Sequence, residues 1–345
     1  MPKTWTSAPV PDYCQSLLRR DFLKGMAVSG AAVAALGLAR AQTMLRADYQ
    51  QFIAEVTEKH AIPRAWLQRL FADVKSLPWI IRAMNAPSTS RPWHEFRKSH
   101  VTAARIDGGV RFWQKHAATL ARAARDFGVP EEIMVATVGI ETHYGGYTGE
   151  VRILDALATL AFDYPKRAAF FRDELEQYLL IGRETSLDIG RLRGSYAGAM
   201  GMPQFLPSSF RKFAVDFDGD GQRNLWRSVP DIVASVANYY KLHDWQPDEA
   251  VVVPAQVSAA PDATLTEDIT PKTSIAEFRK LGVAPSAPVS DEALAALLPL
   301  ETESGMQYWF GLKNFYVITR YNRSTNYAMA VHDIAQGIKT RMKGS

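Results

Sequence analysis

The stretch PEEIMVATVGIETHYGG, residues 130–146, places a lone carboxylate near the end of an apolar helix. Pro130 and the two glutamates after it are typical of a helix start, because proline fits the first turn and carboxylates face the positive end of the helix dipole. The glycine pair at 145–146 is typical of a helix end. Four side chains share one face of this predicted helix: Ile133, Thr137, Ile140 and Glu141.

Glu141 therefore lies on an apolar stripe in the last turn. Burial there is expected to raise the pKa of its carboxyl group, and the carbonyl oxygens at the helix end act in the same direction. A carboxylic acid that keeps its proton near neutral pH can donate it to a glycosidic oxygen. This segment by itself is also consistent with a structural glutamate, either buried with its carboxyl group hydrogen-bonded to a neighbouring residue or exposed to water at the edge of the helix.

A second informative stretch is GSYAGAMGMPQFLPSSF, residues 194–210. Its small residues allow close backbone approach, its serines and Gln204 offer hydrogen bonds, and its aromatic residues offer flat apolar surface. A polysaccharide groove needs this mixture of apolar platforms and polar groups. The alternative is a tight helix–helix crossing built on the small residues.

The composition is that of a globular protein, with 47% hydrophobic and 22% charged residues, which excludes a disordered chain, a collagen-like repeat and a disulfide scaffold. The formal net charge is +4. Residues 1–41 hold five basic and two acidic residues, so 35 basic and 34 acidic residues remain without them. This balance, with no dense basic run, does not indicate nucleic-acid binding.

The N-terminal stretch LLRRDFLKGMAVSGAAVAALGLARAQ, residues 17–42, has the architecture of a signal peptide. The arginine pair at 19–20 followed by Phe22 and Leu23 resembles a twin-arginine export signal. We therefore expect a periplasmic protein without a lipid anchor or stable membrane insertion; a retained N-terminal anchor is the alternative. Cleavage after Ala41 would also remove Cys14, the single cysteine, and would exclude disulfides and thiol chemistry.

A calcium loop is predicted from DFDGDGQRN, residues 216–224, which fits the D-x-D-x-D-G pattern of an EF-hand loop. Gly221 would make the sharp turn at the sixth place, while Arg227 stands at the twelfth place, where a glutamate is expected. An Asx-rich turn without an ion is the alternative. The oxygen ligands predicted from the pattern are Asp216, Asp218, Asp220 and the backbone carbonyl of Gln222. We expect Ca²⁺ in a structural role and no organic cofactor.

Six blocks in this order resemble the soluble lytic transglycosylase B family of bacterial cell-wall enzymes. The blocks are IETHYGG (140–146), RILDALATLAFDYPKRAAFF (152–171), residues 194–210, VDFDGDGQRNLW (215–226), SVANYY (235–240) and FGLKNFYVITRYNRSTNYAMAV (310–331). The resemblance implies a mainly α (α+β) fold with a lysozyme-like helical core. It also implies cleavage of the MurNAc-GlcNAc β-1,4 bond in peptidoglycan without water, which leaves a 1,6-anhydroMurNAc end.

The same resemblance implies roles for single residues. Glu141 would act first as acid and then as base, and Asp231 would be the displaced last ligand of the calcium loop. The residues expected to contact the glycan are Ser195, Gln204, Phe205, Tyr239, Tyr321, Asn322 and Tyr327. Glycan strands are the expected partner, and other cell-wall enzymes are further candidates. His143 departs from the family, in which an aromatic residue is common at this place.

Two other functions remain open at this level. A hydrolytic muramidase on the same fold would need a second carboxylate, for which Asp155 and Asp163 are candidates. A non-catalytic peptidoglycan-binding protein would have no use for a carboxylate on an apolar face.

The organisation expected along the chain has four parts. They are a signal peptide at 1–41, a helical α domain at 42–105, a catalytic core at 106–246 and 305–345, and a small β-containing domain at 247–304. Apolar residues at three- and four-residue steps predict helices at 48–85, 109–127 with a stop at Gly128, 130–144, 151–182 with a break at Pro165, 231–243 and 324–341. VVVPAQV (251–257) and FYVITRY (315–321) are predicted to be strands.

Overall fold

The computed structural model describes residues 45–85 and 91–344. Residues 47–345 form one compact unit. The predicted export signal at residues 1–41, including Cys14, lies outside the described residues. Within the part of the chain that the structure describes, no helix has the length and apolar character needed to cross a membrane.

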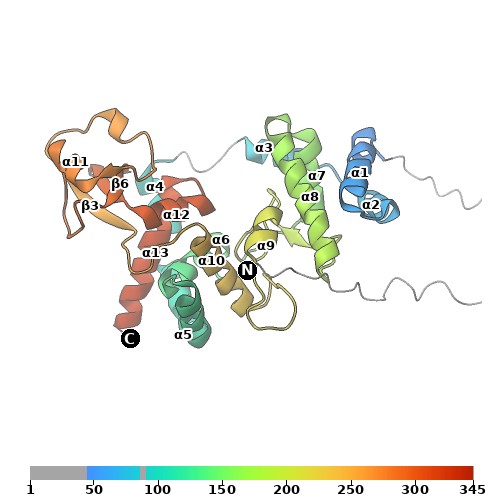
Figure 1. Ribbon diagram of the computed structural model, residues 1–345, viewed down its shortest axis with the longest axis horizontal. Helices are drawn as coiled ribbons and strands as arrows, with labels where there is room; N and C mark the ends of the chain where they lie inside the picture. The colour runs from blue at the N-terminus through green and yellow to red at the C-terminus, as the bar shows by residue number, and fades with distance from the viewer. Residues whose placement is uncertain (1–44, 86–90, 345) are drawn as a thin grey trace, which may run out of the picture. The chain divides into compact units, whose positions relative to one another are not determined.

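Four helices make up the N-terminal part of the described chain (Figure 1). The helical stretch predicted at 48–85 is divided into three of them, because Pro63 and Pro78 each stand at a helix start and cannot continue a preceding helix. The four helices are α1 (Ala47–His60), α2 (Arg64–Phe71), α3 (Pro78–Met84) and α4 (Trp93–His100).

The long helix α5 (Ala103–Phe127) packs against the short apolar helix α6 (Glu131–Thr142). α5 begins six residues before the predicted start at Gly109, because the Thr102 side chain caps it by accepting a hydrogen bond from the Arg105 N–H. It ends at Gly128, which adopts a left-handed conformation as the sequence predicts.

Two further helices, α7 (Ile153–Asp163) and α8 (Ala168–Glu184), pack against each other on either side of the predicted break at Pro165. The strand β1 (Val151–Arg152) pairs antiparallel with β2 (Arg193–Gly194). The chain continues into α9 (Pro207–Phe213) and α10 (Val229–Leu242).

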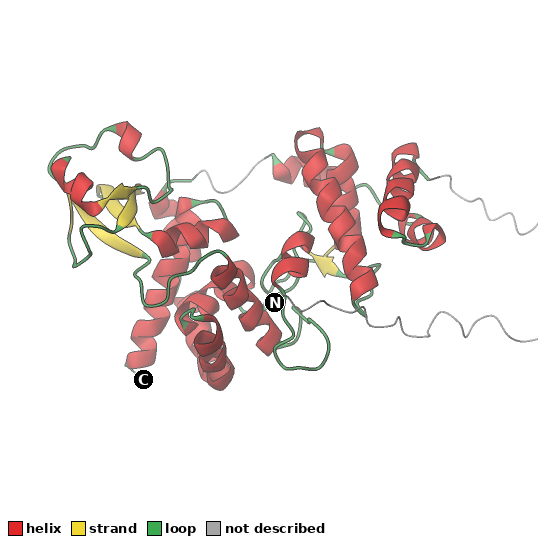
Figure 2. Ribbon diagram, viewed as in Figure 1, coloured by secondary structure: helices red, strands yellow, loops and turns green. Residues whose placement is uncertain are grey.

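A five-stranded antiparallel sheet follows α10, with the strand order β4-β6-β7-β3-β5 (Figure 2). Its strands are β3 (Val252–Val257), β4 (Thr273–Ser274), β5 (Val283–Pro285), β6 (Leu294–Thr302) and β7 (Gly305–Gly311), and α11 (Ile275–Lys280) packs beside it. The predicted strand at 251–257 is therefore confirmed. The boundary predicted at residue 304 falls inside the hairpin between β6 and β7, so the sheet continues to Gly311.

The strand predicted at 315–321 is wrong, since these residues lie in the helix α12 (Lys313–Tyr321). Phe315, Ile318 and Thr319 are buried at helical spacing. Packing of this face overrides the β-propensity of the aromatic and β-branched residues. The last helix, α13 (Thr325–Lys343), agrees with the prediction for 324–341 and packs against α5, α6 and α12.

Close contact between two backbone segments joins the end of α6 to the 194–210 stretch. A Cβ atom on Gly149 would lie 2.1 Å from the Gly194 carbonyl oxygen, and the φ angle of Gly149 is +92°. A Cβ atom on Gly194 would in turn lie 2.1 Å from the Ala199 carbonyl oxygen. The small residues of this stretch thus serve close backbone approach within turns and bridges, and the alternative of a helix–helix crossing is wrong.

Substituting Gly149→Ala should therefore lower the free energy of unfolding by about 2–4 kcal/mol, because strain at positive φ adds to a backbone clash. Urea denaturation measures this value. The matched control is Gly305→Ala, at a glycine with φ +117° and nothing within 4 Å of the added Cβ, which should lose only about 1–2 kcal/mol. Equal losses in the two variants would contradict the steric explanation.

Candidate active site

The end of α6 is held by a buried arginine. The α6 helix ends at Thr142, two residues before the predicted end, because His143 turns into a left-handed conformation with φ +51°. The Arg105 side chain, only 5% exposed, donates from Nε to the Gly139 carbonyl oxygen at 3.1 Å and from Nη2 to His143 Nε2 at 2.8 Å. The same guanidinium also donates to the His100 carbonyl oxygen. Burial, together with the charge of Arg105, lowers the pKa of His143, so the neutral ring can accept this hydrogen bond.

The carboxyl group of Glu141 is partly buried in the last turn of this helix. Tyr327, in the first turn of α13, donates its hydroxyl proton to Glu141 Oε1 at 2.5 Å. Burial raises the pKa of Glu141 to about 7, and the hydrogen bond from Tyr327 opposes that rise. The carboxyl group can therefore exist in both protonation states near neutral pH, as a proton donor and acceptor requires.

A wall of tyrosines surrounds this carboxyl group. The Tyr321 ring lies parallel to the Tyr327 ring at a centroid distance of 6.5 Å and an angle of 13°, and the Tyr240 ring lies 5.7 Å from Tyr321. A hydrogen bond of 2.8 Å joins the Tyr240 hydroxyl to Thr137 Oγ1, so the wall is tied back to α6 itself. Burial raises the pKa of all three tyrosines, so their hydroxyls stay protonated.

The 194–210 stretch is connected to the same helix end. The Thr142 hydroxyl donates to the Met202 carbonyl oxygen at 3.1 Å. Gln204 adopts φ +52°, and its side-chain Nε2 donates to the carbonyl oxygens of Thr148 and Gly201 at 3.1 and 2.8 Å. These bonds fix the Gln204 amide between the loop after α6 and its own turn.

The structure brings Tyr321 and Tyr327 beside Glu141, while the other predicted sugar contacts have different surroundings. Ser195 is partly buried, and its Oγ accepts hydrogen bonds from the backbone of residues 197 and 199. Asn322 is exposed directly after α12. Tyr239 is buried at 7% exposure and donates its hydroxyl proton to the Arg320 carbonyl oxygen at 2.5 Å.

Phe205 differs most from its predicted surroundings, because it is only 2% exposed. Its ring packs against the rings of Tyr239 and Tyr321 at centroid distances of 5.7 and 5.8 Å. Phe205 is therefore a supporting residue beneath the tyrosine wall in this structure, and its role as a direct sugar contact stays a prediction.

Sequence reasoning missed Arg105, Thr137 as a hydrogen-bonding partner and Tyr240. Tyr240 directly follows Tyr239 in SVANYY, so the doubled tyrosine was a usable signal, although it does not say which ring faces α6. Arg105 lies in the first turn of α5 and carries no sequence signal that separates it from a surface arginine.

The two candidates for a second catalytic carboxylate, Asp155 and Asp163, are both engaged in structural hydrogen bonds. Asp155 Oδ1 accepts hydrogen bonds from the Lys75 N–H at 3.1 Å and from Arg152 Nη1 at 3.2 Å. Asp163 Oδ2 accepts from the Ser76 hydroxyl at 2.7 Å. Both carboxylates attach the segment between α2 and α3 to α7.

A separate acidic cluster lies in the loop before α10. Oxygen atoms of Asp216, Asp218 and Asp231 lie within 4.8 Å of one another. Asp231, in the first turn of α10, also accepts hydrogen bonds from the Phe217 and Asn224 backbone at 2.8 Å. The displaced position of Asp231 therefore still reaches the loop, and three carboxylate oxygens at this spacing fit a calcium ion.

The remaining predicted ligands are part of the same loop. Asp220 Oδ1 accepts a hydrogen bond from the Gln222 N–H at 2.8 Å, and both residues are exposed. Gly221 has φ +84°, as the sharp turn of an EF-hand loop requires. Arg227 is exposed, and its N–H donates to Asn224 Oδ1 at 3.1 Å.

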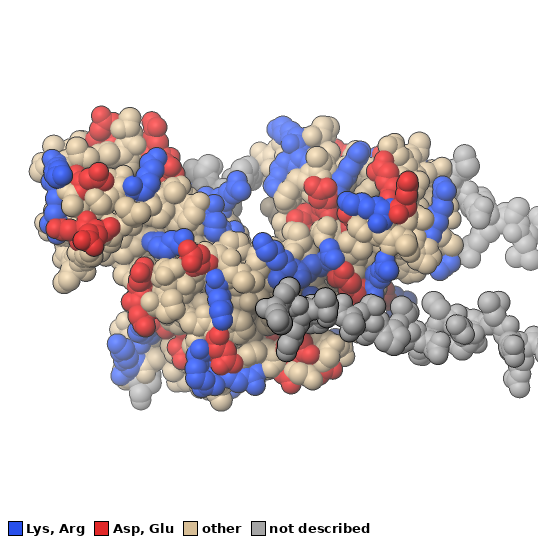
Figure 3. Space-filling view, in the orientation of Figure 1, with Lys and Arg blue, Asp and Glu red and all other residues tan. Residues whose placement is uncertain are grey.

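Surface charge does not point to a nucleic-acid partner. Basic and acidic side chains are interspersed on the visible face of the molecule (Figure 3). This pattern agrees with the nearly balanced charge count of the chain after residue 41.

A desolvated carboxyl group at a helix end, backed by tyrosines in a mainly helical protein, defines a lysozyme-like glycan-cleaving enzyme. The pattern of the transglycosylase SLT domain matches residues 45–336. The membrane-bound lytic murein transglycosylase B of Escherichia coli strain K12 is 44% identical over 301 residues, covering 84% of this chain and 82% of that protein. The chain therefore belongs to the transglycosylase SLT family.

Solved structures agree with this assignment. The soluble lytic transglycosylase SltB1 of Pseudomonas aeruginosa has a TM-score of 0.82 at 44% identity, covering 86% of this chain and all of that one. The Escherichia coli lytic transglycosylase Slt35 in complex with calcium has a TM-score of 0.80 at 42% identity, covering 86% and 93%. Pseudomonas aeruginosa SltB3 in complex with NAG-anhNAM-pentapeptide has a TM-score of 0.76 at 29% identity, covering 85% and 79%.

Replacing Glu141 by glutamine should stabilise the protein increasingly as the pH rises from about 4.5 to about 7, with a constant gain above that range. The pKa of Glu141 is raised from 4.5 to about 7 in the folded state, so its contribution is fully present below pH 4.5 and is lost as the pH rises through 7. A neutral glutamine avoids that loss. We expect Glu141→Gln to exceed the wild type by roughly 2–3 kcal/mol in free energy of unfolding at pH 8.5 and to equal it near pH 4.

Urea denaturation across this pH range measures the difference. The exposed Glu267 provides the control, because Glu267→Gln removes one carboxylate without removing a buried one. A Glu141→Gln variant with the same pH dependence as the wild type would show that the carboxyl group is not desolvated.

Proposed function

We propose that this chain is a lytic transglycosylase that cleaves the MurNAc-GlcNAc β-1,4 bond of peptidoglycan and leaves 1,6-anhydroMurNAc ends. The observation that carries the proposal is the partly buried Glu141 carboxyl group, whose pKa is raised to about 7. Membership of the transglycosylase SLT family supports it, as does the complex of the relative SltB3 with NAG-anhNAM-pentapeptide.

Glu141 serves twice in the proposed reaction. The protonated carboxyl group first donates its proton to the glycosidic oxygen as the bond to the MurNAc anomeric carbon breaks. The substrate's N-acetyl group stabilises the electron-poor carbon, as in substrate-assisted glycosidases. The ionised carboxylate then takes the proton of the C6 hydroxyl, whose oxygen attacks the anomeric carbon of the same ring. This intramolecular attack replaces water.

Tyr327 suits both halves of this cycle. Burial favours the protonated acid that the first step needs, while the 2.5 Å hydrogen bond from Tyr327 stabilises the carboxylate that the second step needs. The opposing effects place the pKa near the pH at which both forms are populated, where proton transfer is most efficient.

The glycan contacts belong to the same proposal. Tyr321 offers its ring beside the acid, Asn322 and Ser195 offer polar groups, and the Gln204 amide is oriented by two backbone carbonyls. Tyr239 and Phe205 are buried behind this surface and support the Tyr321 ring.

We propose in addition that the loop of Asp216, Asp218 and Asp231 binds a structural calcium ion, with Asp220 and the Gln222 carbonyl as the remaining ligands. The spacing of the three carboxylates supports this assignment, as does the calcium complex of Slt35. The ion would offset most of the repulsion among the carboxylates at the start of α10 and thereby stabilise the helix that carries Tyr240.

Export to the periplasm through the twin-arginine route is part of the proposal, since peptidoglycan lies outside the cytoplasmic membrane. The arginine pair and apolar run in residues 17–42 support it.

The reaction is tested by Glu141→Gln on purified sacculi. We expect turnover to fall by about 10³-fold or more, because the proton donor and acceptor are both lost, while circular dichroism shows an unchanged fold. Mass spectrometry of the wild-type products should find each released fragment one water lighter than its hydrolysis product. Fragments of hydrolytic mass would instead identify a muramidase, and ordinary turnover by the variant would exclude Glu141 as the acid.

The calcium proposal is tested by thermal unfolding with and without a chelator. Loss of an ion bound only by the folded state should lower the melting temperature of the wild type by about 3–8 °C. The double variant Asp216→Asn, Asp218→Asn should no longer respond, while Asp262→Asn, at an exposed position far from the loop in sequence, should respond like the wild type. A wild-type melting temperature that is insensitive to chelation would contradict calcium binding.

A further inference from the structure

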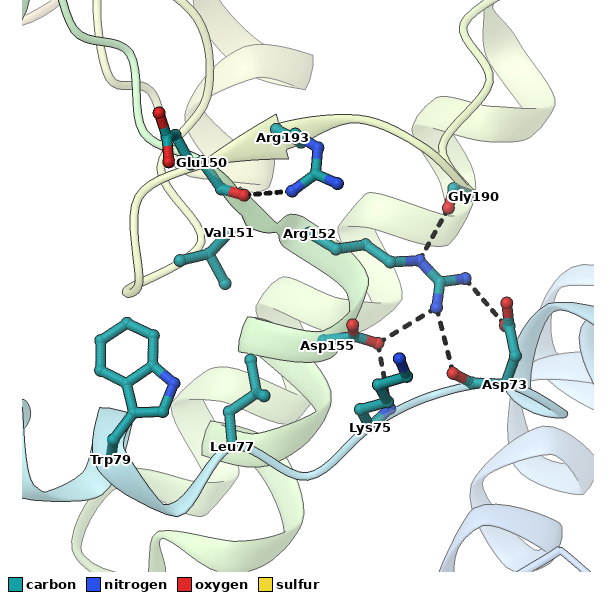
Figure 4. A pocket seen from close by; sticks show the side chains of 10 residues that line it. All are labelled: Asp73, Lys75, Leu77, Trp79, Glu150, Val151, Arg152, Asp155, Gly190 and Arg193. Carbon is teal, nitrogen blue, oxygen red and sulfur yellow. Dashed lines mark hydrogen bonds and ion pairs between the residues drawn. The ribbon is translucent and has the colours of Figure 1, made fainter.

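A hollow of about 490 Å³ lies beside the β1–β2 pair, outside the residues that surround Glu141 (Figure 4). One side is formed by the segment from the end of α2 to the start of α3, and the other by β1, the first turn of α7 and the segment that leads into β2. Its lining residues are Asp73, Lys75, Leu77, Trp79, Glu150, Val151, Arg152, Asp155, Gly190 and Arg193.

A network around Arg152 fixes the shape of this hollow. Arg152 donates from Nε to the Gly190 carbonyl oxygen at 2.7 Å and from Nη2 to Asp73 Oδ1 at 2.9 Å. Its Nη1 lies 3.2 Å from Asp155, which also binds the Lys75 backbone (Figure 4). The segment before α3 is therefore attached to β1 and α7 through the mostly buried side chains of Arg152 and Asp155, while the Asp73 side chain is exposed.

Two exposed aromatic rings meet at the edge of the hollow. Trp79 is 42% exposed and Tyr196 is 41% exposed, and their ring centroids lie 6.3 Å apart at an angle of 57°. The apolar side chains of Leu77 and Val151 lie beside Trp79 at the same end of the hollow (Figure 4). Trp79 is in the first turn of a helix whose start is fixed by the Leu77 N–H, which donates to Thr159 Oγ1 at 2.9 Å.

The charges of the hollow balance. The basic side chains lining it are three, those of Lys75, Arg152 and Arg193, and the acidic side chains are also three, those of Asp73, Glu150 and Asp155. Such a surface has no preference for a polyanion or for an acidic peptide. It combines flat apolar rings with many hydrogen-bonding groups, which is what the face and the hydroxyl edge of a sugar ring require.

Along the chain, the hollow adjoins segments that carry residues of the proposed glycan contacts. Tyr196 directly follows Ser195, and β2 ends one residue before Ser195. On the other strand, Gln204 binds the Thr148 carbonyl oxygen three residues before β1 begins. The Trp79–Tyr196 pair is therefore joined through Tyr196 to the chain segment that carries Ser195, one of the proposed glycan contacts.

We propose that Trp79 and Tyr196 form a remote subsite that binds a sugar ring of the glycan strand away from the bond that is cleaved. The inference rests on the proposed function, because it takes the glycan strand as the ligand. It goes further by assigning recognition of long strands to Trp79 at the start of α3 and to Tyr196 after β2, neither of which has a part in the chemistry proposed at Glu141.

The test uses peptide-free glycan strands and the inactive Glu141→Gln protein, so that binding is measured without turnover. Adding Trp79→Ala should raise the dissociation constant for long strands by about three- to tenfold, as expected for the loss of one stacked aromatic ring. Binding of a disaccharide, which is too short to reach both sites, should be unchanged. Trp79→Phe should keep most of the affinity for long strands.

The matched control is Leu281→Ala in the same background, which removes an exposed apolar side chain (57%) from the sheet region. An unchanged affinity of Trp79→Ala for long strands would overturn the proposal, as would an equal loss for the disaccharide. A loss seen only with peptide-bearing strands would show that the hollow binds the stem peptide instead.

The two proposals fail in distinguishable ways. Wild-type protein that releases anhydro fragments, combined with a Trp79→Ala variant that binds long strands normally, would leave the proposed function intact and remove the subsite. Absence of glycan cleavage and binding in the wild type would remove both.

Discussion

The contact on which the site depends is the hydrogen bond between the Tyr327 hydroxyl and the Glu141 carboxyl group. It joins the last turn of α6 to the first turn of α13, two segments separated by 186 residues of chain. The carboxyl group can be desolvated only because other chain segments cover it, and it can be ionised only because one of those segments carries a donor. Arg105 and Tyr240 hold the α6 side of this contact through the Gly139 carbonyl oxygen and Thr137.

The end of α6 shows how much structure this contact requires. Arg105 binds the Gly139 carbonyl oxygen and His143, and Tyr144 donates its hydroxyl proton to the Arg105 carbonyl oxygen at 2.8 Å. The Tyr144 ring lies so close to Gly139 that a Cβ atom there would be 2.4 Å from its hydroxyl oxygen. The end of the helix is thus held by three side chains, the Arg105 guanidinium, the neutral His143 imidazole and the Tyr144 phenol. These contacts fix the orientation of the last helical turn, which carries Glu141.

The acidic loop and the tyrosine wall are parts of one arrangement. Asp231 belongs to the loop and to the first turn of α10, and Tyr239 and Tyr240 lie in the last turns of the same helix. An ion bound at the loop would therefore hold the helix that positions the wall. On the other side of the site, Arg152 and its carboxylate partners hold the segment that carries Trp79. Charged groups in both places thus hold segments that carry residues of the proposed glycan-binding surface.

The sequence by itself predicted the elements whose signals are local. The helix start at Pro130 with its acidic turn, the stop at Gly128 and the calcium loop pattern are set by backbone conformation and charge within a few residues. The position of Glu141 on an apolar face also follows from helical spacing alone. The strand predicted at 315–321 is wrong because the propensity of these aromatic and β-branched residues favours a strand, whereas burial of one face against the core favours the helix α12.

Only the tertiary structure decided how these elements serve the site. Nothing in the sequence separates Tyr327, which binds Glu141, from Tyr239, which binds a backbone carbonyl, or from the buried Phe205. The sequence determined which residue could be the acid, since helix periodicity depends on neighbours along the chain. The fold decided its pKa and its hydrogen-bonding partner, because desolvation and hydrogen bonding depend on atoms brought together from distant segments.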